Sequence, residues 1–308
     1  MSVNKIVTKV DGTINKTIDF NDLKAGLAEG AHTITVEAYN GATLISSQTK
    51  NIITTTATAT VDADYQAVLD YATAQSIALP DATQQQIDNQ LMIDLKATGK
   101  WGVCKSFLNL KGTATSSFKL IDWKRLVKYT DFGSPTWSSS GIKGNGVNAY
   151  INLAWNFEDI ALGFNDIAIG FTLFDAAVTV DSAYSVIFGS ASSATSNSQT
   201  RFYIYQGVIA GYIYDKTQGG VSATVTDANG FNMETISSTG IRKLFLKGVE
   251  KNTSTYSAVS RDLYYNYLLA QNRVDIPSGY CLQGLSNFIV LNTEPTDQEV
   301  QNFNTILG

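Results

Sequence analysis

The stretch GIKGNGVNAYINLAWN, residues 141–156, decides the fold of this chain. Glycines at positions 141, 144 and 146 supply backbone bends that residues with a Cβ atom resist. The apolar residues that follow alternate with period two, which is typical of a half-buried β-strand; they are Val147, Ala149, Ile151 and Leu153. We interpret the stretch as the lead-in and first strand of a large β-sandwich that continues to the C-terminus.

Short apolar runs separated by clusters of Ser, Gly and Asn flank this stretch on both sides. Before it, strands are predicted at Val103–Leu110, Phe118–Ile121 and Trp123–Tyr129. After it, they are predicted around Ile167–Phe174, Tyr184–Phe188, Phe202–Tyr205, Val208–Tyr214, Val221–Thr226, Lys243–Lys247, Ser254–Ser260 and Ser286–Leu291. Many short strands with regular turn signals indicate a sandwich or jelly roll. Thr296 with Glu299 three residues later forms a capping-box pattern, which predicts a terminal helix.

Residues 61–99 change to a helical period. Asp62–Gln75 places four apolar residues on one helical face; they are Tyr65, Val68, Leu69 and Ala72. A second helix is predicted to begin at the N-cap Asp81, to bury a stripe spaced by four residues, and to end at Gly99; the stripe is Ile87, Leu91 and Leu95. Two helices of this size bury little by themselves. We therefore expect them to pack on the domain that follows, through Trp101.

The first part of the chain is predicted to form a small β unit. Lys5–Lys9 and Thr17–Phe20 are extended, and a short helical turn or loop is expected at Leu23–Ala28. His32–Ala38 alternates with period two and leads into Asn40–Gly41, the strongest short hairpin signal. This hairpin resembles the last hairpin of fibronectin-type-III or immunoglobulin-like modules. With the run TTTATAT at 54–60 as a linker, the predicted domains are 1–56 (Ig-like attachment unit), 57–100 (helical pair and linker) and 101–308 (sandwich).

The composition excludes several classes of function. The net charge of −5 and a pI near 4.9 predict no nucleic-acid partner, which would need a basic face. Ile167–Val180 is interrupted by polar residues, so no membrane span is expected. The N-terminal MSVNKIVTKVDG has no apolar core, which predicts no secretory signal. Cys104 and Cys281 have neither disulfide-framework nor metal-ligand spacing and are predicted to be small buried hydrophobic residues.

Three stretches carry a resemblance to a known family. They are LPDATQQQIDNQLMIDLKATGKWGVCKSF, FKLIDWKRL and SPTWSSSGIKGNGVNAYINLAWNF. These resemble a module in head and tail appendage proteins of tailed bacteriophages, especially phages of gut Bacteroidetes, over roughly residues 60–308. The resemblance implies a mainly β chain in which a helical pair precedes a sandwich similar to laminin-G and concanavalin A-like domains. It also implies a structural or adhesive role, other virion proteins as partners, a homo-oligomer for which a trimer is one arrangement, and glycan contact at the sandwich.

The tyrosines of two neighbouring predicted strands are the candidate ligand-binding residues. Tyr203 and Tyr205 share one strand face, and Tyr212 and Tyr214 share a face on the next strand. Together they are candidates for a stacking platform for sugar rings, although core or subunit contacts are the commoner role of such residues. A second aromatic run carries the same ambiguity; it comprises Tyr264, Tyr265 and Tyr267.

No catalytic or metal-binding constellation is visible, so no catalytic residue, metal or cofactor is predicted. His32 is the only histidine, and a triad would depend on it alone. A glycosidase would need two carboxylates across the scissile bond; the candidates are Glu158, Asp159, Asp166, Asp175, Asp215 and Glu234. The E-x-D-x-E or E-x-D-x-x-E run of concanavalin A-like hydrolases is absent. Aspartates at predicted strand ends are weak calcium candidates; they are Asp181, Asp215 and Asp227.

These observations lead to one main hypothesis and two alternatives. The main hypothesis is a non-enzymatic phage virion protein, a head or tail fibre or decoration subunit, assembled in the host cytoplasm. Its N-terminal unit attaches to the particle, and its sandwich projects and contacts glycans. The alternatives are a polysaccharide-degrading enzyme of a phage and a host surface lectin, which would need an export route.

Overall fold

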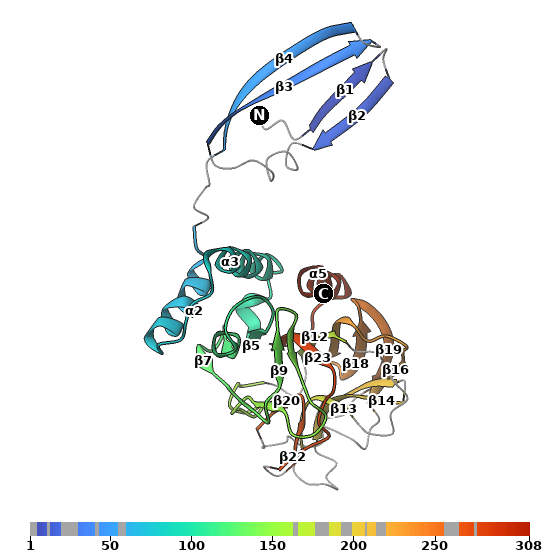
Figure 1. Cartoon of the computed structure of the whole chain (residues 1–308). Coiled ribbons are helices and arrows are strands. Elements are labelled where there is room, and N and C mark those ends of the chain that lie inside the picture. The colour runs from blue at the N-terminus through green and yellow to red at the C-terminus, as the bar shows by residue number, and fades with distance from the viewer. Residues whose placement is uncertain are drawn as a thin grey trace. The chain divides into compact units, whose positions relative to one another are not determined.

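The structure is a computed structural model, and contacts divide the chain into two compact units, Met1–Thr60 and Val61–Gly308 (Figure 1). In the first unit it describes the backbone of four strands. In the second, hereafter the sandwich unit, it describes 61–162, 166–175, 185–191, 199–206, 208–213, 220–255, 265–273 and 276–308. The predicted helical pair thus lies in the same compact unit as the sandwich.

Two antiparallel hairpins make up the described part of the first unit. Strand β1 (Lys5–Val10) pairs with β2 (Thr13–Asp19), and β3 (Gly30–Asn40) pairs with β4 (Thr43–Thr54). The predicted hairpin at Asn40–Gly41 is confirmed, because Asn40 lies opposite Thr43. The predicted turn at Leu23–Ala28 and positions 55–59 of the predicted linker lie outside the described residues. The Ig-like nature of this unit stays a prediction.

The sandwich unit contains two large sheets, which confirms the predicted mainly β sandwich. Within its described residues, the eight-stranded sheet has the order β19 (Val249–Thr255), β18 (Ile241–Leu246), β17 (Gly230–Ile236), β12 (Ile167–Phe174), β23 (Gly284–Leu291), β10 (Gly141–Lys143) and β9 (Thr136–Ser138), with β5 (Cys104–Asn109) also paired to β23. The nine-stranded sheet has the order β16 (Val221–Thr224), β15 (Val208–Tyr212), β14 (Gln199–Tyr205), β13 (Ser185–Ala191), β20 (Tyr267–Leu268), β11 (Tyr150–Asn152) and β8 (Thr130–Phe132). Strand β21 (Gln271–Arg273) pairs with β13 and with β22 (Ile276–Ser278). A small hairpin, β6 (Ile121–Asp122) with β7 (Val127–Lys128), stands apart from both.

The stretch at 141–156 contributes to the core between the two sheets. Ile151, Leu153 and Trp155 are fully buried in one apolar cluster that also contains residues of β12 and β23. The Trp155 indole lies against Phe288 of β23 and donates a hydrogen bond of 2.9 Å from Nε1 to the Tyr129 hydroxyl. The predicted alternation is therefore confirmed from Ala149 onward, but the stretch is not the first strand of the sandwich, because β5, β8 and β9 come before it in the chain. Val147, by contrast, is 72% exposed, because it lies in the loop before β11.

Helices cover the other face of the eight-stranded sheet (Figure 1). They are α2 (Ala63–Ala74), α3 (Ala82–Ala97) and α5 (Asp297–Leu307). Along β12, Ile169 and Phe171 belong to the core between the sheets, whereas Ala168 belongs to the cluster under the helices. Both faces of this strand are buried, which explains why its sequence is apolar at every position except Thr172. The predicted role of Trp101 is confirmed, since it is buried in the same cluster as the helices.

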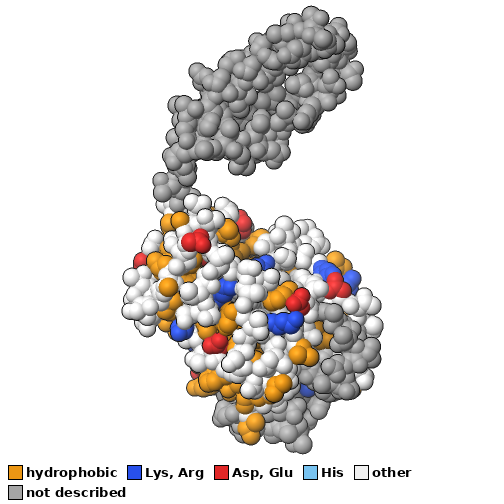
Figure 2. Space-filling model, viewed as in Figure 1, with side chains coloured by type: hydrophobic (Ala, Val, Ile, Leu, Met, Phe, Trp, Pro, Cys, Tyr) orange, Lys and Arg blue, Asp and Glu red, His pale blue; other side chains and the backbone are white. Residues whose placement is uncertain are grey.

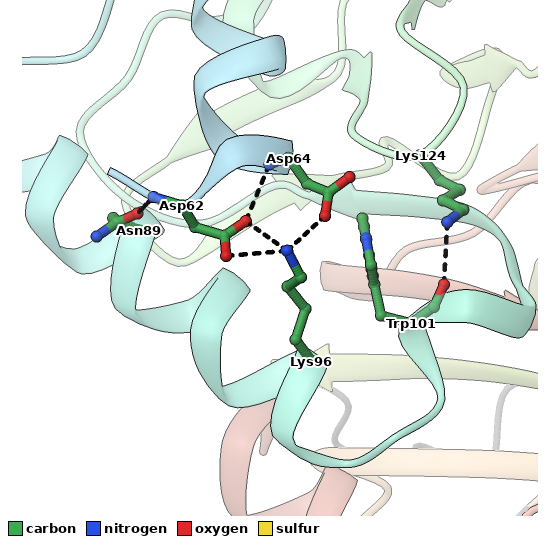
Figure 3. Close-up of polar contacts among 6 residues, drawn as sticks. All are labelled: Asp62, Asp64, Asn89, Lys96, Trp101 and Lys124. Atoms are coloured by element: carbon green, nitrogen blue, oxygen red, sulfur yellow. Dashed lines mark hydrogen bonds and ion pairs between the residues drawn. The ribbon is translucent and has the colours of Figure 1, made fainter. Parts of the chain in front are cut away.

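Helix α2 follows the sequence prediction closely, and polar contacts hold its first turn (Figure 3). Its predicted apolar face is the buried one. Asp62 caps the helix, and its carboxylate accepts hydrogen bonds of 2.9 Å from Lys96 Nζ at the last turn of α3. The Asp62 amide donates to Asn89 Oδ1 over 2.7 Å. Lys124 lies 4.9 Å from the centre of the Trp101 ring and donates to its carbonyl. These contacts join the start of the sandwich unit to α3.

Helix α3 corrects the prediction of its buried face. Asp81 is the N-cap as predicted, but Ile87 is 57% exposed. The buried stripe contains polar residues; it is Gln84, Asp88, Asn89, Met92 and Leu95. The reason is that Asp88 accepts beneath the helix from Asn109 Nδ2 and the Tyr65 hydroxyl, and within α3 from Gln84 Nε2. A hydropathy pattern cannot register Asn109 and Tyr65 as partners, because they come from other elements.

Several further strand predictions need correction. Phe118 lies in a short helix, α4 (Ser116–Lys119), because Thr115 caps it by accepting from the Phe118 amide. The predicted strand Trp123–Tyr129 is instead a turn at Trp123–Leu126 followed by the short strand β7. Strands β8, β9, β17, β20, β21 and β22 were not predicted. The predicted strand at Ser254–Ser260 is described only up to Thr255, where β19 ends.

The two cysteines are free and buried, as predicted, and burial raises the pKa of Cys281 to about 11.

Replacing Thr296 with alanine is expected to lower the free energy of unfolding by about 1 kcal/mol. The predicted capping box is present: the Glu299 amide donates to Thr296 Oγ1 over 3.3 Å, and the Thr296 amide donates to Glu299 Oε2 over 2.7 Å. Urea unfolding of the full chain measures the loss. Thr305→Ala, on the same helix but away from its cap, is the matched control and should change stability by less than half as much.

Candidate ligand-binding surface

Tyr203 and Tyr205 lie on the outer face of the nine-stranded sheet, while Phe202 and Ile204 between and beside them face the core. Tyr203 packs with Val186 and Ala210 and is only 8% exposed. The Arg201 guanidinium lies 4.6 Å from the centre of the Tyr203 ring. The structure therefore places both tyrosines on one face, as predicted, with Tyr203 packed against its neighbours rather than open to solvent.

The other two predicted tyrosines are less fully described. Tyr212 lies opposite Arg201 in the pairing of β14 with β15, and its side chain lies outside the described residues. Tyr214 lies wholly outside them. Of the second aromatic run, Tyr264 also lies outside, Tyr265 is 45% exposed, and Tyr267 belongs to β20.

A row of stacked aromatic rings crosses three neighbouring strands of the same sheet. Phe132 of β8 stacks on Tyr150 of β11, with ring centres 4.9 Å apart and planes 14° apart. Tyr150 in turn stacks on Tyr267 of β20, at 4.7 Å and 25°. We call these three residues the aromatic stack. Tyr280 adds a tilted ring 6.5 Å from Tyr150, and burial, with the neighbouring Tyr280, raises the pKa of Tyr150.

The aromatic stack lies on the outer face because of strand parity. Ile151 and Leu268 face the core, so their sequence neighbours Tyr150 and Tyr267 face outward. Phe132 is 41% exposed, and Tyr267 at the other end is 5% exposed. The stack therefore opens to solvent at its Phe132 end.

Exposed aliphatic side chains enlarge the apolar surface beside the stack. Val147 is 72% exposed and Leu282 is 48% exposed. Gly146 has φ +72°, and a Cβ atom there would lie 2.6 Å from Leu282 Cδ2, so this close approach needs glycine. Figure 2 shows hydrophobic side chains gathered on this part of the sandwich, around β20 and β22. Contiguous exposed apolar surface of this kind marks binding sites more often than scattered single residues do.

A single asparagine holds the loop beside the aromatic stack. Asn145 Oδ1 accepts hydrogen bonds from the backbone amides of Val147, Asn148 and Ala149, at 2.9–3.0 Å. Its Nδ2 donates to the carbonyl of Gly133, next to Phe132 in the chain, over 2.9 Å. These hydrogen bonds fix the loop to the chain next to the edge strand β8. The backbone around the aromatic stack is therefore held in place before any ligand binds.

Most of the predicted carboxylate candidates have structural partners. Glu234 is fully buried and pairs with Arg242, with 3.1 Å between Oε1 and Nε. Asp175 pairs with Lys143, and Asp227 with Lys247. Asp159 accepts from the Asn156 amide in the turn that also contains Glu158.

Only some of the remaining candidates lie within the described residues. Asp166 is exposed, while Asp181 and Asp215 lie outside the described residues, as does the side chain of His32. Among the residues that the structure describes, no group of three or more His, Cys, Asp or Glu side chains is placed to hold a metal ion. In the same part of the chain, no helix has the length and apolar character needed to cross a membrane.

Comparison with known proteins shows the fold and no more. No protein-family model matches the chain, and no curated protein matches it. Among solved structures, it is similar to a botulinum neurotoxin type C protein (10% identity, TM-score 0.53, covering 69% of this chain and 53% of that one). It is also similar to the serotype D/C neurotoxin binding domain (12% identity, TM-score 0.51, covering 68% and 53%). The chain thus matches about half the length of these structures, whose β-sandwich it shares.

Proposed function

We propose that this chain is a non-enzymatic, glycan-binding appendage protein of a tailed-phage virion. The observation that carries the glycan-binding part is the aromatic stack on the outer face of the nine-stranded sheet, open at Phe132. Ring faces offer flat apolar surfaces that match the C–H faces of sugars, and tyrosine hydroxyls add hydrogen-bonding groups. The neighbouring Asn148 supplies a side-chain amide suited to sugar hydroxyls, and Asn145 holds it in place by donating from Nδ2 to Asn148 Oδ1 over 2.8 Å.

Two further considerations support the proposal. The type C neurotoxin structure is described as showing cell entry that depends on interaction with two ganglioside molecules, so a sandwich of this class is compatible with glycan contact. The virion part rests on the sequence resemblance over residues 60–308 and on the chain order of a small β unit, a helical pair and a sandwich. In this proposal the first unit attaches to other virion proteins, the chain forms a homo-oligomer, and the sandwich projects.

Phe132→Ala and Tyr150→Ala are each expected to weaken glycan binding about tenfold, since aromatic contacts are worth on the order of 1 kcal/mol. A glycan array with the full chain identifies the ligand, and calorimetry then measures its dissociation constant for each variant. Tyr150→Phe, which keeps the ring, should retain most of the affinity.

Val249→Ala is the matched control, because Val249 is also exposed but lies on β19 in the other sheet. Unchanged affinity in both alanine variants would contradict a site at the aromatic stack. Release of reducing ends from the bound glycan would contradict the non-enzymatic assignment and favour a depolymerase. An array without any glycan hit would count against glycan binding altogether.

A further inference from the structure

Three neighbouring strands place polar side chains in one row on the helix-covered face of the eight-stranded sheet. Thr172 of β12 lies opposite Asn287 of β23, and Asn287 lies opposite Asn109 of β5. Two residues further along, this face is apolar, with Phe107 and Ile289 in the cluster under the helices. Polar groups in such a place need hydrogen-bond partners, because burial without them is costly.

Asn109 and Asn287 of this row lie on the floor of a groove between α3 and the C-terminal end of α5, which we call the end groove. Its volume is about 530 Å³. Apolar side chains of both helices line it; they are Ile87, Leu91 and Ile306. Asp88 and Asp94 of α3 line it as well.

Almost every polar atom on the floor has a partner. The Leu307 carbonyl accepts from Thr172 Oγ1 (3.0 Å), Lys111 Nζ (2.9 Å) and Asn287 Nδ2 (3.2 Å). Asn109 Nδ2 donates to Asp88 Oδ1 over 2.9 Å.

One acceptor is left over. Asn287 is 1% exposed, and its Oδ1 has no hydrogen-bond donor among the described residues. A 180° flip of the Asn287 amide, which exchanges Oδ1 and Nδ2, is unfavourable because it would place Oδ1 next to the Leu307 carbonyl oxygen. A buried acceptor without a donor, in the wall of an open groove, indicates a ligand that brings the donor.

The charge of the end groove restricts the chemistry of that ligand. Two carboxylates and the C-terminal end of α5, which carries partial negative charge, line the same groove as the open acceptor. The one cation in its lining, Lys111, already donates to Leu307. A complementary ligand therefore has a positive donor group and an apolar portion to cover Ile87 and Ile306.

We propose that the end groove binds a primary ammonium group carried on an aliphatic stem, with the ammonium donating to Asn287 Oδ1 beside Asp88 and the stem lying on Ile87, Leu91 and Ile306. A lysine side chain and a free polyamine share this chemistry.

The test uses the full chain and saturation-transfer NMR with n-hexylamine at pH 7.5, with 1-hexanol as the uncharged probe of equal length. Hexylamine should bind at least fivefold more tightly than hexanol. Equal binding of the two probes, or no binding of either, would overturn the proposal.

Asp94→Asn should weaken hexylamine binding about threefold to tenfold. Asp70→Asn is its matched control, since Gln66 donates to Asp70 on α2 as Gln90 donates to Asp94 on α3, each over 2.8 Å. Asn287→Leu should abolish binding, with a thermal melt to verify folding. If Asp94→Asn and Asp70→Asn change the hexylamine affinity equally, the end groove is not the binding site, even if Asn287→Leu abolishes binding.

A pH series adds an independent readout. Burial raises the pKa of Asp88 to about 6, against the hydrogen bonds of Gln84 and Tyr65, the charge of Lys119 and the hydrogen bond of Asn109. Hexylamine stays charged between pH 5 and 8, so binding should weaken severalfold as Asp88 is protonated towards pH 5. Constant affinity across this range would count against the proposed role of Asp88.

Two further probes separate the sources of the ammonium group. Tighter binding of an acetyl-lysine-amide peptide than of cadaverine would indicate a lysine of a partner protein. The reverse order would indicate a free polyamine, and either order supports the groove as an ammonium site.

Discussion

Arg242→Met is expected to lower the free energy of unfolding by about 3–5 kcal/mol at pH 8, because it leaves the Glu234 carboxylate buried without its counter-charge. Both side chains are fully buried, 3.1 Å apart, and Arg242 Nη2 also donates to the Ile213 carbonyl over 2.8 Å. The site leaves no spare room: a Cβ atom on Gly211 of β15 would overlap the Glu234 carboxylate. The backbone of β15 thus lies directly against the buried carboxylate.

The loss in Arg242→Met should depend on pH in a defined direction. Burial raises the pKa of Glu234 to about 7, against the opposing charge of Arg242, so removing Arg242 raises it further. A carboxyl whose folded pKa exceeds its unfolded value favours the folded state at low pH, and this contribution is lost as pH rises through the folded pKa. The destabilisation should accordingly shrink to about 1–2 kcal/mol near pH 5, where the loss comes from packing and hydrogen bonding rather than from a buried charge.

Urea titrations at pH 5 and pH 8 measure this difference. The matched control is the double variant Glu234→Gln with Arg242→Met, which removes both charges. It should be more stable than Arg242→Met at pH 8 and should show little dependence on pH over this range. An Arg242→Met loss of equal size at both pH values would show that the carboxylate charge is not its cause.

Trp155→Ala is expected to cost about 3–5 kcal/mol of unfolding free energy, the range for removing a large buried aromatic side chain. Trp155 is fully buried between the sheets, where its ring lies against Phe157, Phe188 and Phe288. The variant also leaves the Tyr129 hydroxyl without the indole donor. Because these neighbours come from both sheets, the cavity cannot close by moving one strand.

Equilibrium unfolding by circular dichroism measures the loss from Trp155→Ala. Trp155→Phe, which keeps most of the apolar volume but not the Nε1 donor, should cost about half as much or less. Phe132→Ala is the surface control, since Phe132 is 41% exposed, and its cost should stay near 1 kcal/mol. If Trp155→Ala cost no more than Phe132→Ala, the core between the sheets would not depend on this residue.

Features that depend on neighbours along the chain were predictable. The buried face of α2, the capping box of α5 and the position of β12 follow from spacing and from side chains three or four residues apart. The buried face of α3 was not predictable, because Gln84 and Asp88 turn inward to meet Asn109, Thr113 and Tyr65. Hydropathy alone assigns Ile87 to the buried face of α3, because it takes no account of these hydrogen-bond partners.

The candidate surface shows the same division. Tyr203 and Tyr205 were found because period two puts them on one strand face, and they are there. Phe132 and Tyr150 were missed, since nothing in either local sequence shows that β8, β11 and β20 are neighbours. Tyr267 lay in a noted aromatic run, but only its pairing with β11 makes it part of a stack.

The amino-acid sequence by itself determined that this chain is mainly β, that a helical pair precedes a sandwich, and that residues 141–156 enter its core. These are consequences of local periodicity, turn chemistry and capping. The tertiary structure alone decided which strands pair, and hence which rings form the aromatic stack and which amide in the end groove keeps an open acceptor. Strand pairing joins residues far apart in the chain. Which strands pair therefore depends on the sum of many contacts and cannot be predicted from any single segment.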